Sequence, residues 1–314
     1  MRKLRSIILW CLLAAMIGLS VFEIFFWFGT PTKAFNQTQD ERITVSGTNI
    51  VYNKQGQGEA ILLIHSGAWS SLEYEAMASA LDDHYTVYRV DLPGFGKSDK
   101  PQITYDLPFL TTKMAGFIQQ FPEQTVHLVG ASFGGTIALQ LAAQYPERIR
   151  SLTLIDPIGF GSEINQLALV AQIPLLAEFL FYPNRTIFNY SLNHGLVDAQ
   201  QLPEQYREQL YQNCQLPKAQ RAKLSILRSS ITVRGVDPVM QQAVTTAAAA
   251  VQQPVLLVWG EQDTYAPITQ LENAKAKLPQ ATSIILPHTG HFAHMESPKL
   301  IVEQLQLFLK KYPL

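Results

Sequence analysis

Short apolar runs alternate with amphipathic stretches along most of the chain after residue 40. Runs rich in β-branched and apolar residues predict eight strands, at residues 43–46, 50–52, 60–65, 85–90, 125–129, 151–156, 255–259 and 283–286. The stretches between them predict helices near residues 72–81, 107–120, 135–143, 238–251, 268–278 and 298–311. This alternation is typical of an α/β fold whose mainly parallel sheet is covered by helices on both faces.

The alternation lapses once. Residues 157–235 have a helical pattern rich in leucine and aromatic residues, and they contain no convincing strand. Because this segment follows a predicted strand, it is inserted at the carboxyl edge of the sheet, where open α/β sheets bind ligands. The pattern therefore predicts a core of residues 41–156 and 236–314 with a helical lid of residues 157–235.

The amino terminus predicts a membrane anchor at residues 1–29. Arg2, Lys3 and Arg5 precede an apolar stretch over residues 7–28, which as a helix would be about 33 Å long and could span a bilayer. Basic residues at this end favour a cytoplasmic N-terminus, with the bulk of the chain on the non-cytoplasmic side and residues 30–40 as a tether. The alternative is a signal peptide cleaved after Ser20, which predicts a secreted protein.

Composition narrows the classes of partner. The 314 residues are 47% hydrophobic and carry a net charge of −1, so a large core can form and no basic surface for nucleic acid is expected. Only two cysteines are present, Cys11 and Cys214, which implies neither a disulfide framework nor a metal cluster.

Candidate chemistry centres on Gly130-Ala131-Ser132-Phe133-Gly134, between a predicted strand and a predicted helix. A G-x-S-x-G sequence in this context indicates a nucleophile elbow, in which a sharp turn presents the serine above the sheet. Side chains two residues before and after the serine would collide in such a turn, and glycine removes them. The competing interpretation is an ordinary glycine-rich turn. The elbow predicts Ser132 as a nucleophile.

A serine hydroxyl needs an adjacent base, most often histidine. His291 lies in the loop after the last predicted strand, where Gly290 lets the chain turn back over the sheet edge. His288 and His294 occupy the same loop and are rivals, with one expected to face solvent and the other to anchor the loop. We assign the base to His291.

A carboxylate must orient that base and stabilise its protonated form. Asp263 follows the strand at residues 255–259 and is the first candidate, although it could also be a turn or cap residue. Asp156, at the end of another strand, is the runner-up, and Glu261 is a weaker candidate. The order Ser132, Asp263, His291 is that of the α/β-hydrolase arrangement.

Attack on a carbonyl also requires donors for the oxyanion. One should be the backbone N–H of Phe133, at the start of the helix. The second should come from the loop after His65, from Gly67 or else Ala68, while His65 itself is expected to order that loop through hydrogen bonds rather than to act as a base.

The motifs together resemble the α/β-hydrolase fold family, in its lidded serine esterase, lipase and carbon–carbon hydrolase branch. The resemblance rests on residues 63–67, 91–99, 130–135, 259–263 and 290–298, with Ser66 where the family usually has glycine. It implies a serine hydrolase that cleaves small carboxylic esters without a cofactor. The alternatives are a carbon–carbon hydrolase, a thioesterase or a cofactor-free haloperoxidase on the same triad, or a non-catalytic binding module. Serine at position 132 argues against the epoxide hydrolases and haloalkane dehalogenases of this fold, which need a carboxylate nucleophile.

Overall fold

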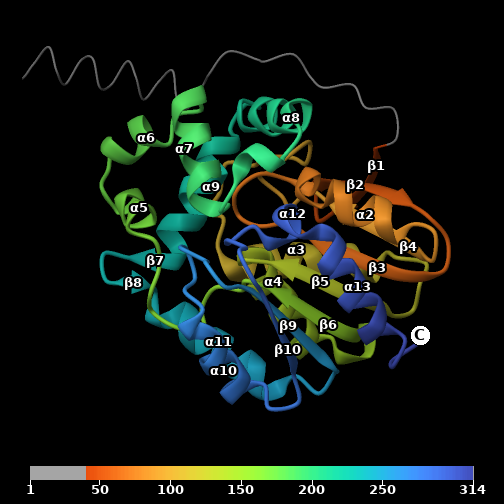
Figure 1. Ribbon diagram of the computed structural model, residues 1–314. Helices are drawn as coiled ribbons and strands as arrows, with labels where there is room; N and C mark the ends of the chain where they lie inside the picture. Colours follow the sequence, from red (N-terminus) through yellow and green to blue (C-terminus); the bar gives the residue numbers. More distant parts are fainter. Residues whose placement is uncertain (1–39, 314) are drawn as a thin grey trace, which may run out of the picture.

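The computed structural model describes residues 40–313, and its centre is an eight-stranded sheet (Figure 1). The strands lie in the order β1-β2-β4-β3-β5-β6-β9-β10. Their bounds are β1 Glu41–Val45, β2 Thr48–Gln55, β3 Glu59–Ile64, β4 Tyr85–Val90, β5 Val126–Ala131, β6 Ile149–Ile155, β9 Val255–Gly260 and β10 Thr282–Leu286. The strands from β4 to β10 pair in parallel, and β2 is antiparallel to both of its neighbours. The predicted mainly parallel eight-stranded sheet is thus confirmed.

The sheet is buried on both faces, as the continuous apolar runs predicted. Strand β3 illustrates this, because Ala60, Leu62 and Ile64 join one core cluster whereas Ile61 and Leu63 join the other. The first cluster includes side chains of α3 Leu107–Gln119, α4 Phe133–Gln144, α10 Pro238–Ala250 and α11 Thr269–Lys277. The second includes side chains of α2 Glu75–Leu81 and α13 Pro298–Leu309.

Two local details depart from the sequence-based boundaries. The helix expected over residues 72–81 begins as a 3₁₀ turn, η1 Ser71–Tyr74, and continues as α2. Ser70 caps that turn by accepting a hydrogen bond from the N–H of Leu72. A short helix that the pattern did not indicate, α12 Ala293–Glu296, lies between the loop that contains His291 and helix α13.

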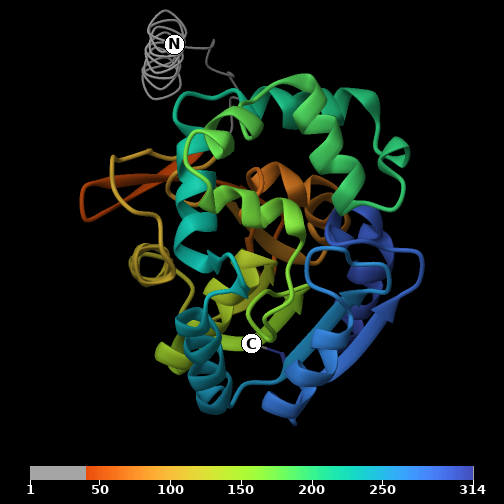
Figure 2. The same ribbon diagram turned by 90° about the vertical axis from the view of Figure 1, so that its left-hand side faces the viewer.

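Between β6 and α10 the chain forms a separate group of short helices, drawn in green and teal in Figure 2. Their bounds are α5 Gln166–Leu169, η3 Val170–Gln172, α6 Leu176–Leu180, α7 Arg185–Gly195, η4 Ala199–Gln201, α8 Glu204–Cys214 and α9 Ala219–Ser230. A two-stranded hairpin, β7 Ile231–Thr232 with β8 Gly235–Val236, ends the segment where no strand was expected. Trp69 and Phe292, from loops of the core, pack in one cluster with side chains of α7 and α8.

The predicted membrane anchor at residues 1–29 lies outside the described residues. Within residues 40–313, α3 and α10 are the longest helices at 13 residues, or about 20 Å, which falls short of a hydrocarbon core of about 30 Å. No helix in this part of the chain is both long and apolar enough to cross a membrane. On this finding the predicted localisation, a membrane-anchored protein with its catalytic domain on the non-cytoplasmic side, is corrected. The prediction that the protein associates with a membrane through an N-terminal helix is likewise not supported by the described residues.

Candidate active site

A sharp turn between β5 and α4 presents Ser132. Its backbone has φ 52° and ψ −121°, a region that L-residues rarely occupy and in which strain is stored. A Cβ on Gly130 would lie 2.4 Å from the carbonyl oxygen of Gly134, and a Cβ on Gly134 would lie 2.2 Å from that of His65. Both glycines are therefore required by close backbone contacts, for the reason the sequence motif indicated.

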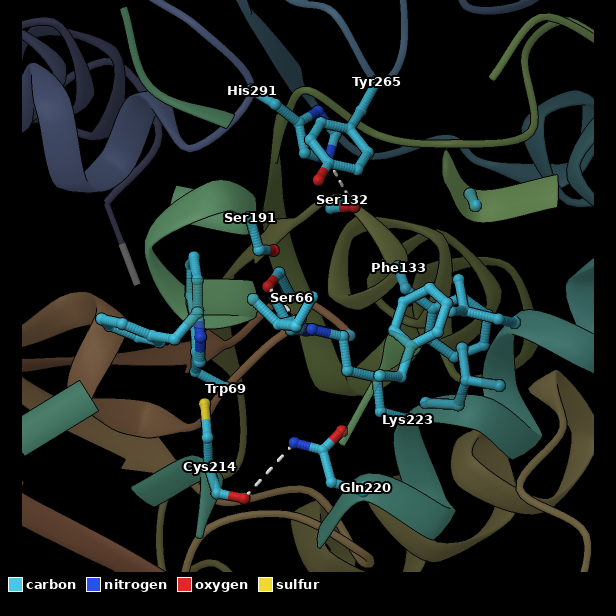
Figure 3. A pocket seen from close by; sticks show the side chains of 18 of the residues that line it. Ser66, Trp69, Ser132, Phe133, Ser191, Cys214, Gln220, Lys223, Tyr265 and His291 are labelled. Atoms are coloured by element: carbon cyan, nitrogen blue, oxygen red, sulfur yellow. Dashed lines mark hydrogen bonds between the residues drawn. The ribbon is translucent and has the colours of Figure 1, made fainter. Parts of the chain in front are cut away.

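Ser132, His291 and Asp263 form a continuous hydrogen-bonded chain, and Figure 3 shows the contact between His291 and Ser132. His291 Nε2 lies 2.8 Å from Ser132 Oγ, and His291 Nδ1 lies 2.8 Å from Asp263 Oδ2. The carboxylate fixes the proton on Nδ1, which leaves Nε2 to accept the proton of the serine hydroxyl. All three residues are buried.

Backbone groups hold Asp263, and rings hold His291. Asp263 Oδ1 accepts hydrogen bonds from the N–H groups of Tyr265 and Ala266, at 2.7 and 2.9 Å. The imidazole of His291 lies against the rings of Tyr265 and Phe292, with centroids 5.0 and 5.2 Å away. The site thus holds the imidazole in one orientation before any substrate binds.

The rival histidines of the loop lie elsewhere. His288 is exposed, and its Nδ1 lies 3.4 Å from the amide nitrogen of Gln262. His294 is fully buried and points to the other side of the loop, where its Nε2 lies 2.9 Å from Glu73 Oε2. Neither histidine contacts Ser132.

The rival carboxylates also differ in position. Glu261 is exposed and accepts a hydrogen bond from the N–H of His288. Asp156 is fully buried, and its Oδ1 accepts from the N–H of Gly260 at 2.7 Å. Burial, followed by the charge of Asp263, raises the pKa of the Asp156 carboxyl well above its usual range. In the described part of the chain, Asp156 makes no hydrogen bond with His291, which pairs with Asp263 instead.

The loop after β3 leaves a single backbone donor available beside Ser132. The N–H groups of Ser66 and Trp69 donate to Glu73, and that of Ala68 donates to Ser66 Oγ. The N–H of Gly67 donates to none of the described residues, and a Cβ on Gly67 would lie 3.6 Å from Phe133 Cβ.

The N–H of Phe133, in the first turn of α4, likewise has no acceptor within the helix. Phe133 and Gly67 thus lie next to each other in the cavity wall, whereas the N–H of Ala68, the alternative donor, is occupied by Ser66 Oγ.

A buried carboxylate that the sequence motifs did not single out holds this loop. Glu73 also accepts from the hydroxyl of Ser66 at 2.8 Å and lies beside His294. Burial alone would raise the pKa of Glu73, but the hydrogen bond and charge of His294, with the N–H of Ser66, lower it. His65 accepts from the N–H of Leu92 at 3.0 Å, so it orders the chain as expected of it.

A cavity of about 320 Å³ opens from Ser132 and His291 toward the inserted helices. Its lining is mostly apolar and includes Phe133 of the core with Leu180, Phe181 and Leu227 of the insertion. Lys223 is the one Lys, Arg, Asp or Glu among the lining residues. A sequence signal for it existed, since Lys223 shares a helical face with apolar residues three and four positions later. Within residues 40–313 no group of three or more His, Cys, Asp and Glu side chains could hold a metal ion.

Comparisons with known proteins agree with this architecture. Residues 59–298 match the family model described as alpha/beta hydrolase fold. A 2-hydroxy-6-oxononadienedioate/2-hydroxy-6-oxononatrienedioate hydrolase of Comamonas testosteroni is 27% identical over 80% of this chain and 88% of its own.

Two solved structures share the fold at low sequence identity. A membrane phospholipase A, described as a bacterial virulence factor, superposes with a TM-score of 0.75 at 24% identity, over 99% of this chain and 98% of its own. A 2-hydroxy-6-oxo-6-phenylhexa-2,4-dienoate hydrolase of Rhodococcus sp. strain RHA1 superposes with a TM-score of 0.74 at 21% identity, over 86% and 98% of the two chains.

Proposed function

The chain belongs to the alpha/beta hydrolase fold family, and from this premise we propose that it is a serine hydrolase that cleaves small carboxylic esters. The observation that carries the proposal is the chain of two 2.8 Å contacts from Ser132 through His291 to Asp263. Nucleophile, base and orienting carboxylate within hydrogen-bond reach of one another are what acyl transfer to serine requires.

Each step of the reaction then has a residue. His291 Nε2 takes the proton of Ser132 Oγ as the oxygen attacks the ester carbonyl, and the N–H groups of Phe133 and Gly67 stabilise the oxyanion. The protonated imidazole, held by Asp263, gives that proton to the departing alcohol, which leaves an acyl group on Ser132. Water, deprotonated by His291, hydrolyses the acyl-enzyme and restores the serine.

We further propose that residues 157–235 are a lid over a core formed by residues 41–156 and 236–314. Helices α6, α7 and α9 contribute apolar side chains to the wall of the cavity that contains Ser132, among them Leu180, Phe188 and Leu227. An apolar cavity excludes bulk water from the reacting carbonyl, which strengthens the electrostatic interactions there. It also favours an apolar acyl or aromatic group in the substrate.

A carbon–carbon bond hydrolase is the second candidate, because the relative in Comamonas testosteroni is named for such a substrate. The same nucleophile and base would serve, but the leaving group would be a carbanion that needs a proton on carbon. Turnover of a dienoic ketone, compared with that of a p-nitrophenyl ester of similar size, separates the two candidates.

The decisive experiment on the shared machinery is Ser132→Ala. Removing the nucleophile should lower ester hydrolysis by at least about 10⁴-fold and abolish labelling by a fluorophosphonate probe, while circular dichroism and the melting temperature stay close to wild type. Retained turnover in Ser132→Ala would contradict the proposal. A wild-type protein that the probe does not label would instead indicate the non-catalytic binding module.

A further inference from the structure

Lys223 is the one lysine or arginine in the wall of a mostly apolar cavity. It lies on α9, and its side chain extends into the cavity on the side of Ser66 and Ser132 in the view of Figure 3. No carboxylate lines the cavity. The reaction proposed above assigns no role to this ammonium group.

Lys223 makes no ion pair or hydrogen bond with any residue in the described range 40–313. Its ammonium lies 6.0 Å from the centroid of the Phe181 ring and near the buried thiol of Cys214. Glu73, whose charge also acts on it, is already engaged by Ser66, Trp69 and His294. Burial lowers the pKa of the Lys223 ammonium because few polar groups replace its hydration.

A second polar group of the same wall lacks a partner. Gln220, one turn before Lys223 on α9, donates from its amide nitrogen to the carbonyl oxygen of Cys214 at 3.4 Å. Its amide oxygen is buried and has no hydrogen-bond partner in the described part of the chain. Buried polar atoms are nearly always hydrogen-bonded, so an unpaired acceptor and an unpaired lysine in the wall of one cavity point to a ligand that supplies their partners.

We propose that Lys223 binds a carboxylate of the substrate, so that the preferred ester carries a free carboxylate on its acyl part. This inference rests on the proposed function. One cation in an apolar wall neutralises a single negative charge, which fits a carboxylate better than a doubly charged phosphate monoester. Gln220 offers an acceptor to a hydroxyl or N–H group next to that carboxylate.

The test uses two esters that differ only in charge, p-nitrophenyl hydrogen adipate and its methyl ester, with the full-length protein. Wild type should have the higher kcat/KM for the charged ester. In Lys223→Met the ratio of the two kcat/KM values should fall by about ten- to a hundredfold, because a charge-assisted hydrogen bond is lost. Lys223→Arg keeps the charge and should retain the preference. Lys310→Met, at an exposed lysine beyond the end of α13, controls for the change in overall charge and should leave the ratio unchanged.

Equal ratios in wild type and Lys223→Met would overturn the proposal, and so would a wild type that prefers the methyl ester. Calorimetric titration of Ser132→Ala with monomethyl adipate and dimethyl adipate tests the carboxylate site without turnover. Tighter binding of the monoester, lost in the Ser132→Ala/Lys223→Met double variant, supports the carboxylate site. That support stands even if wild type hydrolyses neither p-nitrophenyl ester, because failure to hydrolyse them refutes only the proposed function. Tighter binding of hexyl phosphate than of hexanoate would overturn the assignment to a carboxylate.

Discussion

Two buried aspartates lie at the same edge of the sheet, but only Asp263 contacts the imidazole of His291. The difference lies in their environments. Asp263 accepts two backbone hydrogen bonds in addition to that of His291, whereas the second oxygen of Asp156 has no hydrogen-bond partner within residues 40–313. A buried carboxyl with an unpaired oxygen, such as that of Asp156, is favoured as the neutral acid, which is the direction in which its pKa is raised.

Paired substitutions test this division of roles. Asp263→Asn should lower kcat for a p-nitrophenyl ester by roughly 10⁴-fold, since the amide cannot hold the imidazole in the required tautomer. Asp156→Asn should leave kcat near wild type, because an amide resembles the neutral acid and asparagine tolerates the φ of 44° at this position. A large loss of kcat in Asp156→Asn with little loss in Asp263→Asn would reverse the assignment.

The raised pKa of Asp156 also predicts how the free energy of unfolding depends on pH. Because the pKa of Asp156 is raised in the folded protein, the folded state holds this proton more tightly than the unfolded chain. Its contribution to the free energy of unfolding is therefore complete below the unfolded pKa and is lost as pH rises toward the folded pKa. Asp156→Asn has no ionisable group at this position, so its free energy of unfolding does not fall in this way as pH rises. Urea unfolding between about pH 5 and 8 should show the variant gaining stability relative to wild type as pH rises, and a constant difference would contradict a raised pKa.

At the scale of elements, the pair of Glu73 and His294 joins η1, whose Glu73 also holds the loop after β3, to helix α12. Glu73→Gln places an amide nitrogen where N–H and O–H groups now donate, so the loop that contains Gly67 should shift. We expect kcat to fall by roughly 10²-fold with a smaller change in KM, as when an oxyanion donor is lost. Glu272→Gln, at an exposed glutamate, is the control and should match wild type. An unchanged kcat in Glu73→Gln would show that Gly67 does not depend on this contact.

The strands and the motif residues could be predicted because their signals are local. The composition of each apolar run is enough to predict that the run is a buried strand. The strands that precede Ser132, Asp263 and His291 all end at the same edge of a parallel sheet. Glu73 and His294 are 221 residues apart and belong to no shared motif, so only folding brings them together. Lys223 follows the same rule, since its place in the cavity depends on how the inserted helices pack on the core.

At the scale of the whole molecule, the cavity belongs to neither part of the chain alone. The core supplies Ser132, His291 and one wall, and the inserted helices supply the opposite wall. The sequence could predict the insertion from a lapse in alternation, but the size of the space depends on side chains packed between two parts of the fold. Specificity for the acyl group should therefore change with the insertion while the triad stays the same.

Two neighbouring residues of α6 allow this idea to be tested. Leu180 lines the cavity, whereas Phe179 does not and is 63% exposed. Leu180→Ala enlarges the cavity, so the acyl length with the highest kcat/KM should become longer across a series of p-nitrophenyl esters, because added methylenes then find apolar surface to contact. Phe179→Ala removes a larger side chain from the same helix and should leave that optimum where it is in wild type. If both variants shift the optimum equally, the effect comes from loosening α6. If neither does, the acyl group does not lie against this wall.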